Sequence, residues 1–134
     1  MITPSDTRDE PDCPFCALPS SRVLHANAQA IAVRDAYPVS AGHTLVITRR
    51  HFGSFFALDD TERRAMIELL SVCQSELDAL YSPAGYNIGI NDGAAAGQTV
   101  PHVHMHLIPR YGGDVEDPRG GVRWVVPEKA RYWP

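Results

Sequence analysis

Apolar and polar residues alternate strictly over residues 102–107, where every second residue is a histidine. Val103, Met105 and Leu107 occupy the positions between the histidines. Because alternate side chains of a β-strand point to opposite faces, this pattern predicts a strand with an imidazole face and an apolar face. A lone histidine is usually a packed or surface residue, whereas three in strict alternation indicate a functional site. The imidazoles expected on one face are those of His102, His104 and His106.

A second pattern, with apolar residues three and four positions apart, predicts one long amphipathic helix over residues 59–81. Asp59 is the expected N-cap, Glu62 completes a capping box, and Leu58 is the expected hydrophobic staple. The helix should end before Pro83, and we expect it to be scaffold. Its buried stripe should consist of Met66, Leu69, Leu70, Cys73, Leu77 and Leu80.

Shorter apolar runs predict the remaining elements, and a short second helix is expected around residues 52–56. Together with the histidine strand they indicate a compact α+β domain with an antiparallel sheet of about five strands. Arg49 and Arg50 follow one of these strands and are expected at a solvated edge. The additional strands are expected at residues 23–25, 30–34, 43–48 and 85–91, and a short strand-like run at 122–126.

The 134 residues are expected to form one domain at 13–110, after a polar leader at 1–12 and before a tail at 111–134. The leader is expected to be disordered, and the tail to pack on the domain or on a dimer partner. No signal peptide and no stretch of membrane-spanning length is recognised, so we expect a cytoplasmic protein. The three cysteines, an odd number, fit a reducing compartment better than a disulfide framework.

The charge of the chain narrows the class of ligand that it can bind. A formal net charge of −4 argues against binding to a nucleic-acid backbone. An anionic substrate must therefore be held by local hydrogen-bond donors. A single lysine, Lys129, stands against eleven arginines, so no phosphate loop of the G-x-x-x-x-G-K type is present.

Two chemical interpretations of the histidine face compete. Three neutral imidazoles can hold a catalytic zinc ion with an open fourth position. Alternatively, one imidazole is a nucleophile and its neighbours orient it and handle protons. Residues 97–99, Gly-Gln-Thr, precede the strand with a flexible backbone, two polar side chains and N–H groups for an anion, which favours phosphoryl chemistry.

Cys13-x-x-Cys16 has the spacing of a zinc knuckle, but one such pair is only half of a site. The alternative is that the pair consists of two unrelated small apolar residues. If zinc binds here, two further ligands must come from the six histidines.

Residues 102–108, His-Val-His-Met-His-Leu-Ile, resemble the His-φ-His-φ-His-φ-φ signature of the histidine triad (HIT) family of nucleotide hydrolases and transferases. Three further blocks resemble that family in the same order along the chain. They are residues 13–16, residues 35–47 and residues 91–99. The resemblance therefore extends over most of the chain, from about Cys13 to Arg110.

The resemblance implies a hydrolase that cleaves a purine nucleotide conjugate at its α-phosphorus, with AMP or GMP as the nucleotide moiety. The conjugate is expected to be a dinucleoside polyphosphate, a nucleoside phosphoramidate or an acyl nucleotide. His104 would be the nucleophile, forming a nucleotidyl-histidine intermediate, with His106 or His43 assisting the leaving group and no catalytic divalent metal required. Asp35 would bind the ribose, and the α-phosphate would be contacted by Asn91, Gly97, Gln98 and Thr99.

The resemblance also implies a structural zinc ion and a homodimer formed through the long helix and the sheet. The zinc ligands would be Cys13, Cys16, His51 and His102. The residues that follow Pro109, Arg-Tyr-Gly-Gly, are more similar to dinucleotide-hydrolase-like bacterial members than to the phosphoramidases.

Three alternatives remain open at this point. A zinc-dependent hydrolase with all three triad histidines as ligands would leave Cys13 and Cys16 unexplained. A nucleotide-binding or interaction module without catalysis would have no need for a nucleophile. A nucleotidyl transferase or phosphorylase would pass the nucleotide from His104 to an acceptor other than water.

Overall fold

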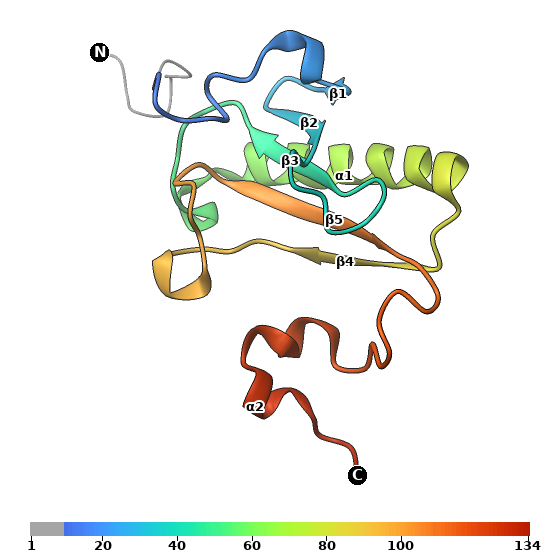
Figure 1. Ribbon diagram of the computed structural model, residues 1–134. Coiled ribbons are helices and arrows are strands. Elements are labelled where there is room, and N and C mark those ends of the chain that lie inside the picture. The colour runs from blue at the N-terminus through green and yellow to red at the C-terminus, as the bar shows by residue number, and fades with distance from the viewer. Residues whose placement is uncertain (1–9) are drawn as a thin grey trace.

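The computed structural model describes residues 10–134 and contains one five-stranded antiparallel sheet with the strand order β1-β2-β3-β5-β4. One long helix, α1, crosses one face of the sheet, and the C-terminal tail lies beside the β4 edge (Figure 1). This α+β architecture confirms the predicted fold class. The strands are β1 (His25–Ala26), β2 (Ala30–Arg34), β3 (Thr44–Thr48), β4 (Gly85–Gly89) and β5 (His104–Arg110).

Most of the predicted leader, residues 1–9, lies outside the described part of the chain. The N–H of Cys13 donates to the carbonyl of Glu10 (3.0 Å), so a turn leads into the Cys-x-x-Cys segment. Within residues 10–134, no helix has both the length and the apolar character needed to cross a bilayer.

Helix α1 (Asp60–Tyr81) begins with the predicted capping box. Asp59 Oδ1 accepts a hydrogen bond from the Glu62 N–H (2.8 Å), and the Asp59 N–H donates to the Glu62 carboxylate (3.1 Å). The stripe ends one turn earlier than predicted, because Leu80 is 61% exposed beyond the end of the buried cluster. The buried members of the predicted stripe are Met66, Leu69, Cys73 and Leu77, with Leu70 partly buried.

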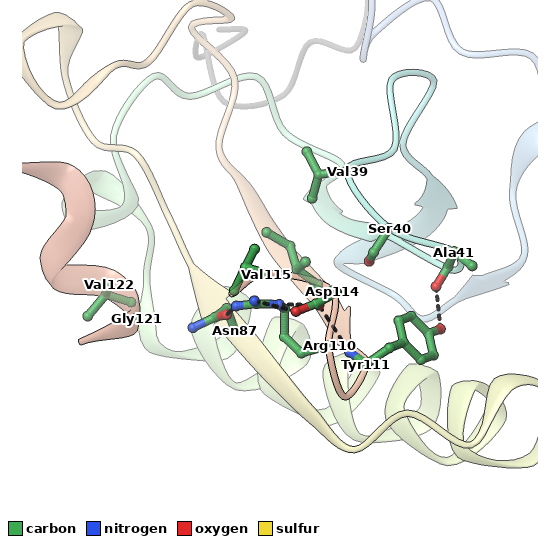
Figure 2. Close-up of a pocket in the computed structure, with 11 residues that line it drawn as sticks. Val39, Ser40, Ala41, Asn87, Arg110, Tyr111, Asp114, Val115, Gly121 and Val122 are labelled. Atoms are coloured by element: carbon green, nitrogen blue, oxygen red, sulfur yellow. Dashed lines mark hydrogen bonds and ion pairs between the residues drawn. The ribbon is translucent and has the colours of Figure 1, made fainter. Parts of the chain in front are cut away.

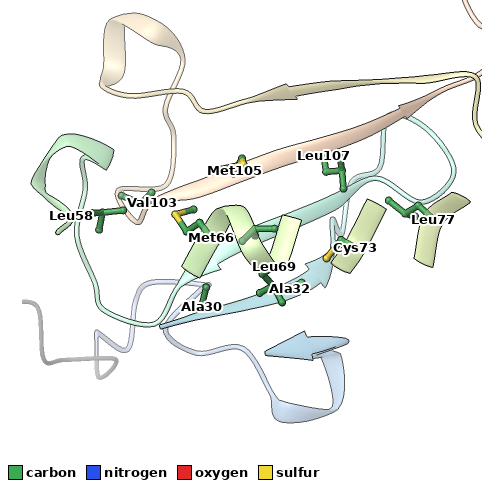
Figure 3. Close-up of a cluster of buried hydrophobic side chains, with 11 residues drawn as sticks. Ala30, Ala32, Leu58, Met66, Leu69, Cys73, Leu77, Val103, Met105 and Leu107 are labelled. Carbon is green, nitrogen blue, oxygen red and sulfur yellow. The ribbon is translucent and has the colours of Figure 1, made fainter. Parts of the chain in front are cut away.

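The main hydrophobic core lies between α1 and the sheet (Figure 3). Val103, Met105 and Leu107 point into this core, as the alternation in the sequence predicted. Burial of such side chains contributes on the order of 1.5–3 kcal/mol each to stability. The remaining members of the cluster come from β2, β3, α1 and the segment before α1: Ala30, Ala32, Val46, Leu58, Met66, Leu69, Cys73 and Leu77.

A second apolar cluster covers part of the opposite face of the sheet. Ile31, Val33, Leu45 and Ile47 pack there under the N-terminal segment, which contributes Phe15, Leu18 and Val23. Because both of their faces are covered, β2 and β3 are almost entirely buried, which explains their unbroken apolar sequences. The N-terminal segment reaches β5 only at its start, where Phe15 packs on His104.

Several short elements differ from prediction. The expected helix at 52–56 is a 3₁₀ helix, η3 (Phe55–Ala57), and β1 is shorter and later than the predicted strand at 23–25. The strand-like run at 122–126 is instead a 3₁₀ helix, η5 (Gly121–Val125), followed by α2 (Pro127–Ala130). The positive φ of Gly120 (92°) turns the chain, and the Arg123 N–H then bonds locally to the Gly120 carbonyl (2.8 Å). In this segment, hydrogen bonds between residues three positions apart take the place of the bonds to a neighbouring strand.

The expectation of a solvated edge at Arg50 is wrong. Its guanidinium forms a paired contact with the Glu62 carboxylate, including an Nε–Oε2 hydrogen bond of 2.6 Å, and Glu62 is 1% exposed. Arg50 therefore neutralises a carboxylate buried at the start of α1. Arg49 is also engaged, through a bond from its Nε to the Asn27 carbonyl (2.9 Å).

We predict that Gly42→Ala destabilises the domain. Gly42 has φ +89°, and a Cβ there would lie 2.7 Å from a Leu77 methyl carbon and 3.1 Å from the Tyr81 ring. Left-handed backbone and overpacking together should lower the free energy of unfolding by about 2–4 kcal/mol. Urea denaturation measures this loss, with Gly112→Ala, a site with no neighbour within 4 Å and no positive φ, as the control. A midpoint equal to that of the control would contradict the prediction.

Candidate active site and metal cluster

A cavity of about 450 Å³ opens on the sheet face that is turned away from α1. Its walls include two triad histidines, His104 and His106, together with His43. Every residue predicted to bind substrate also lines it: Asp35, Asn91, Gly97, Gln98 and Thr99. Tertiary structure thus brings together side chains from two regions that are far apart in the sequence, residues 35–43 and residues 91–106.

The other end of this cavity is apolar, and the sequence analysis did not identify it. Phe15 and Pro14, from the middle of the Cys-x-x-Cys segment, form its wall with Leu18, Val33 and Leu45. Phe15 was already part of a recognised motif, but its role as a cavity wall depends on how the segment folds over β2 and β3.

His104 is held in one tautomer by the backbone. Its Nδ1 lies 2.8 Å from the carbonyl oxygen of His102, and a carbonyl can only accept, so Nδ1–H is the donor. The neutral ring therefore carries its lone pair on Nε2. The Phe15 ring packs edge-on against this imidazole, with centroids 4.8 Å apart, which restricts its rotation.

His43 and His106 form a hydrogen-bonded pair with a defined direction. The Val39 N–H donates to His43 Nδ1 (3.1 Å), so the proton of the neutral His43 ring is on Nε2. That Nε2 lies 2.9 Å from His106 Nδ1 and donates to it. His106 in turn keeps its proton on Nε2, as a hydrogen-bond donor in the wall of the cavity.

Burial keeps this pair neutral. Desolvation lowers the pKa of His43 below 6.5, and the Asp35 carboxylate opposes it. Desolvation likewise lowers the pKa of His106, with further lowering by His104 and His43 and an opposing contribution from Asp35. Both imidazoles are therefore neutral at pH 7.

Asp35, expected at the ribose, follows β2 directly and lies next to the histidine pair. Its Oδ1 accepts from the Tyr37 N–H (2.8 Å), and its Oδ2 lies 3.4 Å from His43 Nε2 and 4.0 Å from His106 Nδ1. Asp35, His43 and His106 are near enough to share a metal ion. The Val39 N–H, however, requires a lone pair on His43 Nδ1 and so keeps the ring proton on Nε2. This favours a hydrogen-bond chain over metal ligation.

The loop before the triad is braced by Gln98. Its Oε1 accepts from the Gly93 N–H (2.7 Å), and its Nε2 donates to the carbonyls of Gly53 (2.7 Å) and Val100 (3.1 Å). Both acceptors of the Gln98 side-chain amide are therefore backbone carbonyls, one next to the loop and one in the segment after β3. Among the groups of this wall that have no hydrogen bond to another described residue are the side chains of Asn91 and Thr99 and the Thr99 N–H.

Four predicted metal ligands converge next to the cavity. The ligand atoms of Cys13, Cys16, His51 and His102 all lie within 4.8 Å of one another. Cys13 Sγ is 3.4 Å from His102 Nδ1, Cys16 Sγ is 3.2 Å from His51 Nδ1, and the two Nδ1 atoms are 3.2 Å apart. The edges of a tetrahedral zinc site with these donors are about 3.3–3.8 Å long, so the four atoms fit such a site.

The tautomer of His102 also fits ligation. Its Nε2 lies 2.7 Å from the Thr48 carbonyl oxygen and must donate to it, which leaves the lone pair on Nδ1 among the cysteines. His102 precedes β5, is fully buried and does not line the cavity. The imidazoles of His102 and His104 both contact Phe15 on the side opposite the core, but His102 lies outside β5 and in the cluster, so the triad is divided between the cavity and the cluster. The same division argues against one catalytic zinc held by all three histidines.

Comparison of the sequence and the fold with known proteins identifies one family. A model of the HIT domain matches residues 18–113. An uncharacterized 16.1 kDa HIT-like protein of Mycoplasma pneumoniae is 38% identical over 104 residues, which cover 75% of this chain and 72% of that protein. A bis(5'-nucleosyl)-tetraphosphatase (asymmetrical) of Schizosaccharomyces pombe is 35% identical over 97 residues, covering 72% of this chain and 53% of that protein.

A solved structure shows the same fold. The crystal structure of a Zn-bound histidine triad family protein from Mycobacterium smegmatis aligns with a TM-score of 0.70 and 31% identity, covering 79% of this chain and 80% of that chain. The domain match, the sequence identity and the shared sheet and helix agree with the histidine signature at the start of β5. The chain therefore belongs to the HIT family.

Proposed function

We propose that this protein hydrolyses nucleotide conjugates at the α-phosphorus through a covalent nucleotidyl-His104 intermediate. The observation that supports this most directly is the bond from His104 Nδ1 to the His102 carbonyl, which leaves Nε2 as a lone-pair nucleophile in the cavity wall. One of the relatives is a bis(5'-nucleosyl)-tetraphosphatase, which supports this class of substrate.

In the first step, a bond forms from His104 Nε2 to the α-phosphorus while the bond to the leaving group breaks. The ring becomes a phosphorylated imidazolium, and the His102 carbonyl stabilises its Nδ1–H. In the second step, water attacks the phosphorus and the N–P bond breaks. His104 returns to its neutral form, and one proton passes to the solvent.

His106 is the better candidate to assist the leaving group. It lines the cavity with Nε2–H as a donor, whereas His43 is only 3% exposed and its Nε2 donates to His106. A neutral imidazole stabilises a departing oxyanion by hydrogen bonding and transfers a proton poorly. This favours a phosphate leaving group, which needs no proton, over an amine.

The remaining cavity groups fit a nucleotide. Asn91 and Thr99 supply donors for the phosphoryl oxygens, which the acidic chain requires because it has no general positive field. The apolar wall with Phe15 and Leu18 suits a purine base, and Asp35 in the same cavity suits ribose hydroxyls. A transferase or phosphorylase would use the same intermediate, and product analysis with added phosphate separates that alternative from hydrolysis.

We further propose that Cys13, Cys16, His51 and His102 hold a structural zinc ion. Bound zinc would supply coordination that fixes the N-terminal segment to the residues before β5. The donor set and its spacing support this, as does the Zn-bound relative. The homodimer and the cytoplasmic location expected from the sequence stay predictions.

The first prediction is a +AMP mass adduct. Wild type, or a His106→Ala variant in which the intermediate persists, should show the adduct after brief incubation with diadenosine tetraphosphate and a quench without acid. His104→Ala should show no adduct and lose turnover by about 10³-fold or more, because the nucleophile is gone.

The matched control is His25→Ala, which removes an imidazole that pairs with Glu76 (3.0 Å) outside the cavity. Turnover without an adduct in either protein, together with activity in His104→Ala, would refute the covalent mechanism. Tight AMP binding without turnover would favour a binding module.

The second prediction concerns metal content. Wild-type protein should contain one zinc ion per chain by elemental analysis, and Cys16→Ser should reduce zinc to a small fraction of that and lower the melting temperature. Cys73→Ala should keep its zinc, because Cys73 lies in the core and not in the cluster. Equal zinc in the two variants would show that the cluster is not the binding site.

The third prediction is a pH dependence of stability. In the folded state His43 and His106 have pKa values below 6.5, so the unfolded chain binds more protons as pH falls below 6.5. Stability is full above about pH 6.5 and should fall by at most about 1 kcal/mol per histidine between pH 6.5 and 5.5. Urea denaturation at both pH values measures this, and His43→Asn should reduce the slope. An unchanged slope in that variant would contradict the assignment.

A further inference from the structure

The loop at residues 35–43 connects β2 to β3 and carries two residues of the cavity wall, Asp35 and His43. A hydrogen bond from the Asp35 N–H to the His43 carbonyl (2.9 Å) joins its two ends. Between these ends the tip of the loop, residues 37–41, has little apolar cover, because Tyr37 is 87% exposed and Val39 is 71% exposed. The tip must therefore be held in place mainly by hydrogen bonds.

The backbone of this tip decides where the proton of the neutral His43 ring lies. The Val39 N–H donates to His43 Nδ1 (3.1 Å), and His43 Nε2–H donates to His106 Nδ1 (2.9 Å). Without the Val39 N–H, the His43 ring is free to carry its proton on Nδ1, and Nε2 then has no proton to donate to His106. The position of the tip therefore controls which nitrogen of His106 is protonated.

Two side-chain hydrogen bonds attach the tip to the end of β5 and to the segment that follows it (Figure 2). Ser40 Oγ donates to the Pro109 carbonyl (2.7 Å). The Tyr111 hydroxyl donates to the Ala41 carbonyl (2.6 Å). Because Ser40 and Ala41 directly follow Val39, both bonds act next to the N–H that orients the histidine pair.

Tyr111 is itself fixed by the turn in which it lies. Its N–H donates to Asp114 Oδ2 (3.1 Å), and the Asp114 N–H donates to the Tyr111 carbonyl (3.0 Å). Arg110 binds the same carboxylate through Nε (2.8 Å) and Nη2 (2.9 Å), and its Nη1 donates to Asn87 of β4 (2.7 Å). The Tyr111 side chain therefore extends from a backbone that is anchored to the sheet.

The Tyr111 hydroxyl is suited to act as a permanent donor. Desolvation and the nearby Tyr81 raise the pKa of Tyr111 above its ordinary value, so the hydroxyl keeps its proton at neutral pH. Its acceptor is a backbone carbonyl, which cannot donate. Neither Tyr111 nor Ser40 lines the cavity that contains His104 and His106, so both act through the loop and not on a bound ligand.

We propose that Tyr111 and Ser40 are positioning residues that fix the proton of His43, and through it the donor of His106, from outside the cavity. The catalytic consequence rests on the proposed function, whereas the position of the ring protons does not. A loop released from these two bonds lets His106 take its proton on Nδ1, towards Asp35, and leaves its Nε2 without a proton for the leaving group.

The direct test is the ¹⁵N NMR spectrum of the histidine rings near neutral pH, because protonated and unprotonated ring nitrogens give well-separated signals. Wild type should show His43 protonated on Nε2 alone, with His43→Asn identifying the signals. Tyr111→Phe removes only the hydroxyl and should move both His43 nitrogens towards a mixture of the two tautomers. Ser40→Ala should act in the same direction, and Ser40→Thr, which keeps a hydroxyl, should retain the wild-type signals.

Tyr86→Phe is the matched control. Its hydroxyl also makes a hydrogen bond, to Asp78 of α1 (2.7 Å), and neither of these residues belongs to the loop. This variant should leave the ring signals of His43 unchanged. The melting temperature of each variant verifies that it folds.

A second measurement uses two esters of AMP, the phenyl ester and the 4-nitrophenyl ester. Phenolate is the more basic leaving group, so its departure depends more on a hydrogen bond from His106. Tyr111→Phe should lower kcat/KM for the phenyl ester by about 3–10-fold, the effect of one lost hydrogen bond, and lower that for the 4-nitrophenyl ester less. The affinity for AMP should not change.

Unchanged His43 ring signals in Tyr111→Phe, or an equal loss of kcat/KM with both esters, would overturn the proposal. Failure of the proposed function is a separate result. Wild type would then turn over neither ester, while the ring signals would still respond to Tyr111→Phe.

Discussion

The hydrogen bond from His104 Nδ1 to the His102 carbonyl is the interaction on which the arrangement of the site depends. His102 uses its backbone to orient His104, the proposed nucleophile, and its side chain to join Cys13, Cys16 and His51. The metal cluster and the cavity therefore share one residue, and Phe15, between the two cysteines, packs on His104 as well. Disorder in the cluster would loosen the His104 imidazole, because its hydrogen-bond partner, the His102 carbonyl, and its packing partner, Phe15, would both move.

The two faces of the sheet are covered to different extents, and this difference leaves the site accessible. Helix α1 packs on β1, β2, β3 and β5 at one face, and the β5 side chains in that core alternate with those of the site. On the other face, the N-terminal segment covers β2 and β3, while the tail contributes η5 beside β4. The uncovered band between them contains the cavity.

Electrostatics in this band rely on local groups, since the chain has a net charge of −4. Desolvation lowers the pKa of His43 and His106, so both act as neutral donors and acceptors, and the Asp35 carboxylate next to them can balance a transient proton. Beyond His106 along β5, Arg110 and Asp114 neutralise each other through a direct ion pair.

The sequence by itself determined the features that depend on local periodicity and capping. The Asp59–Glu62 capping box and the burial of Val103 and Met105 follow from helix and strand geometry alone. Tertiary structure decided where His102 points, because that depends on a carbonyl of β3 and on cysteines 86 and 89 positions away. It also decided the tail, where Gly120 and local hydrogen bonds replaced the ladder that a strand would need. Contacts between distant segments have no periodic signal, so no local pattern could reveal them.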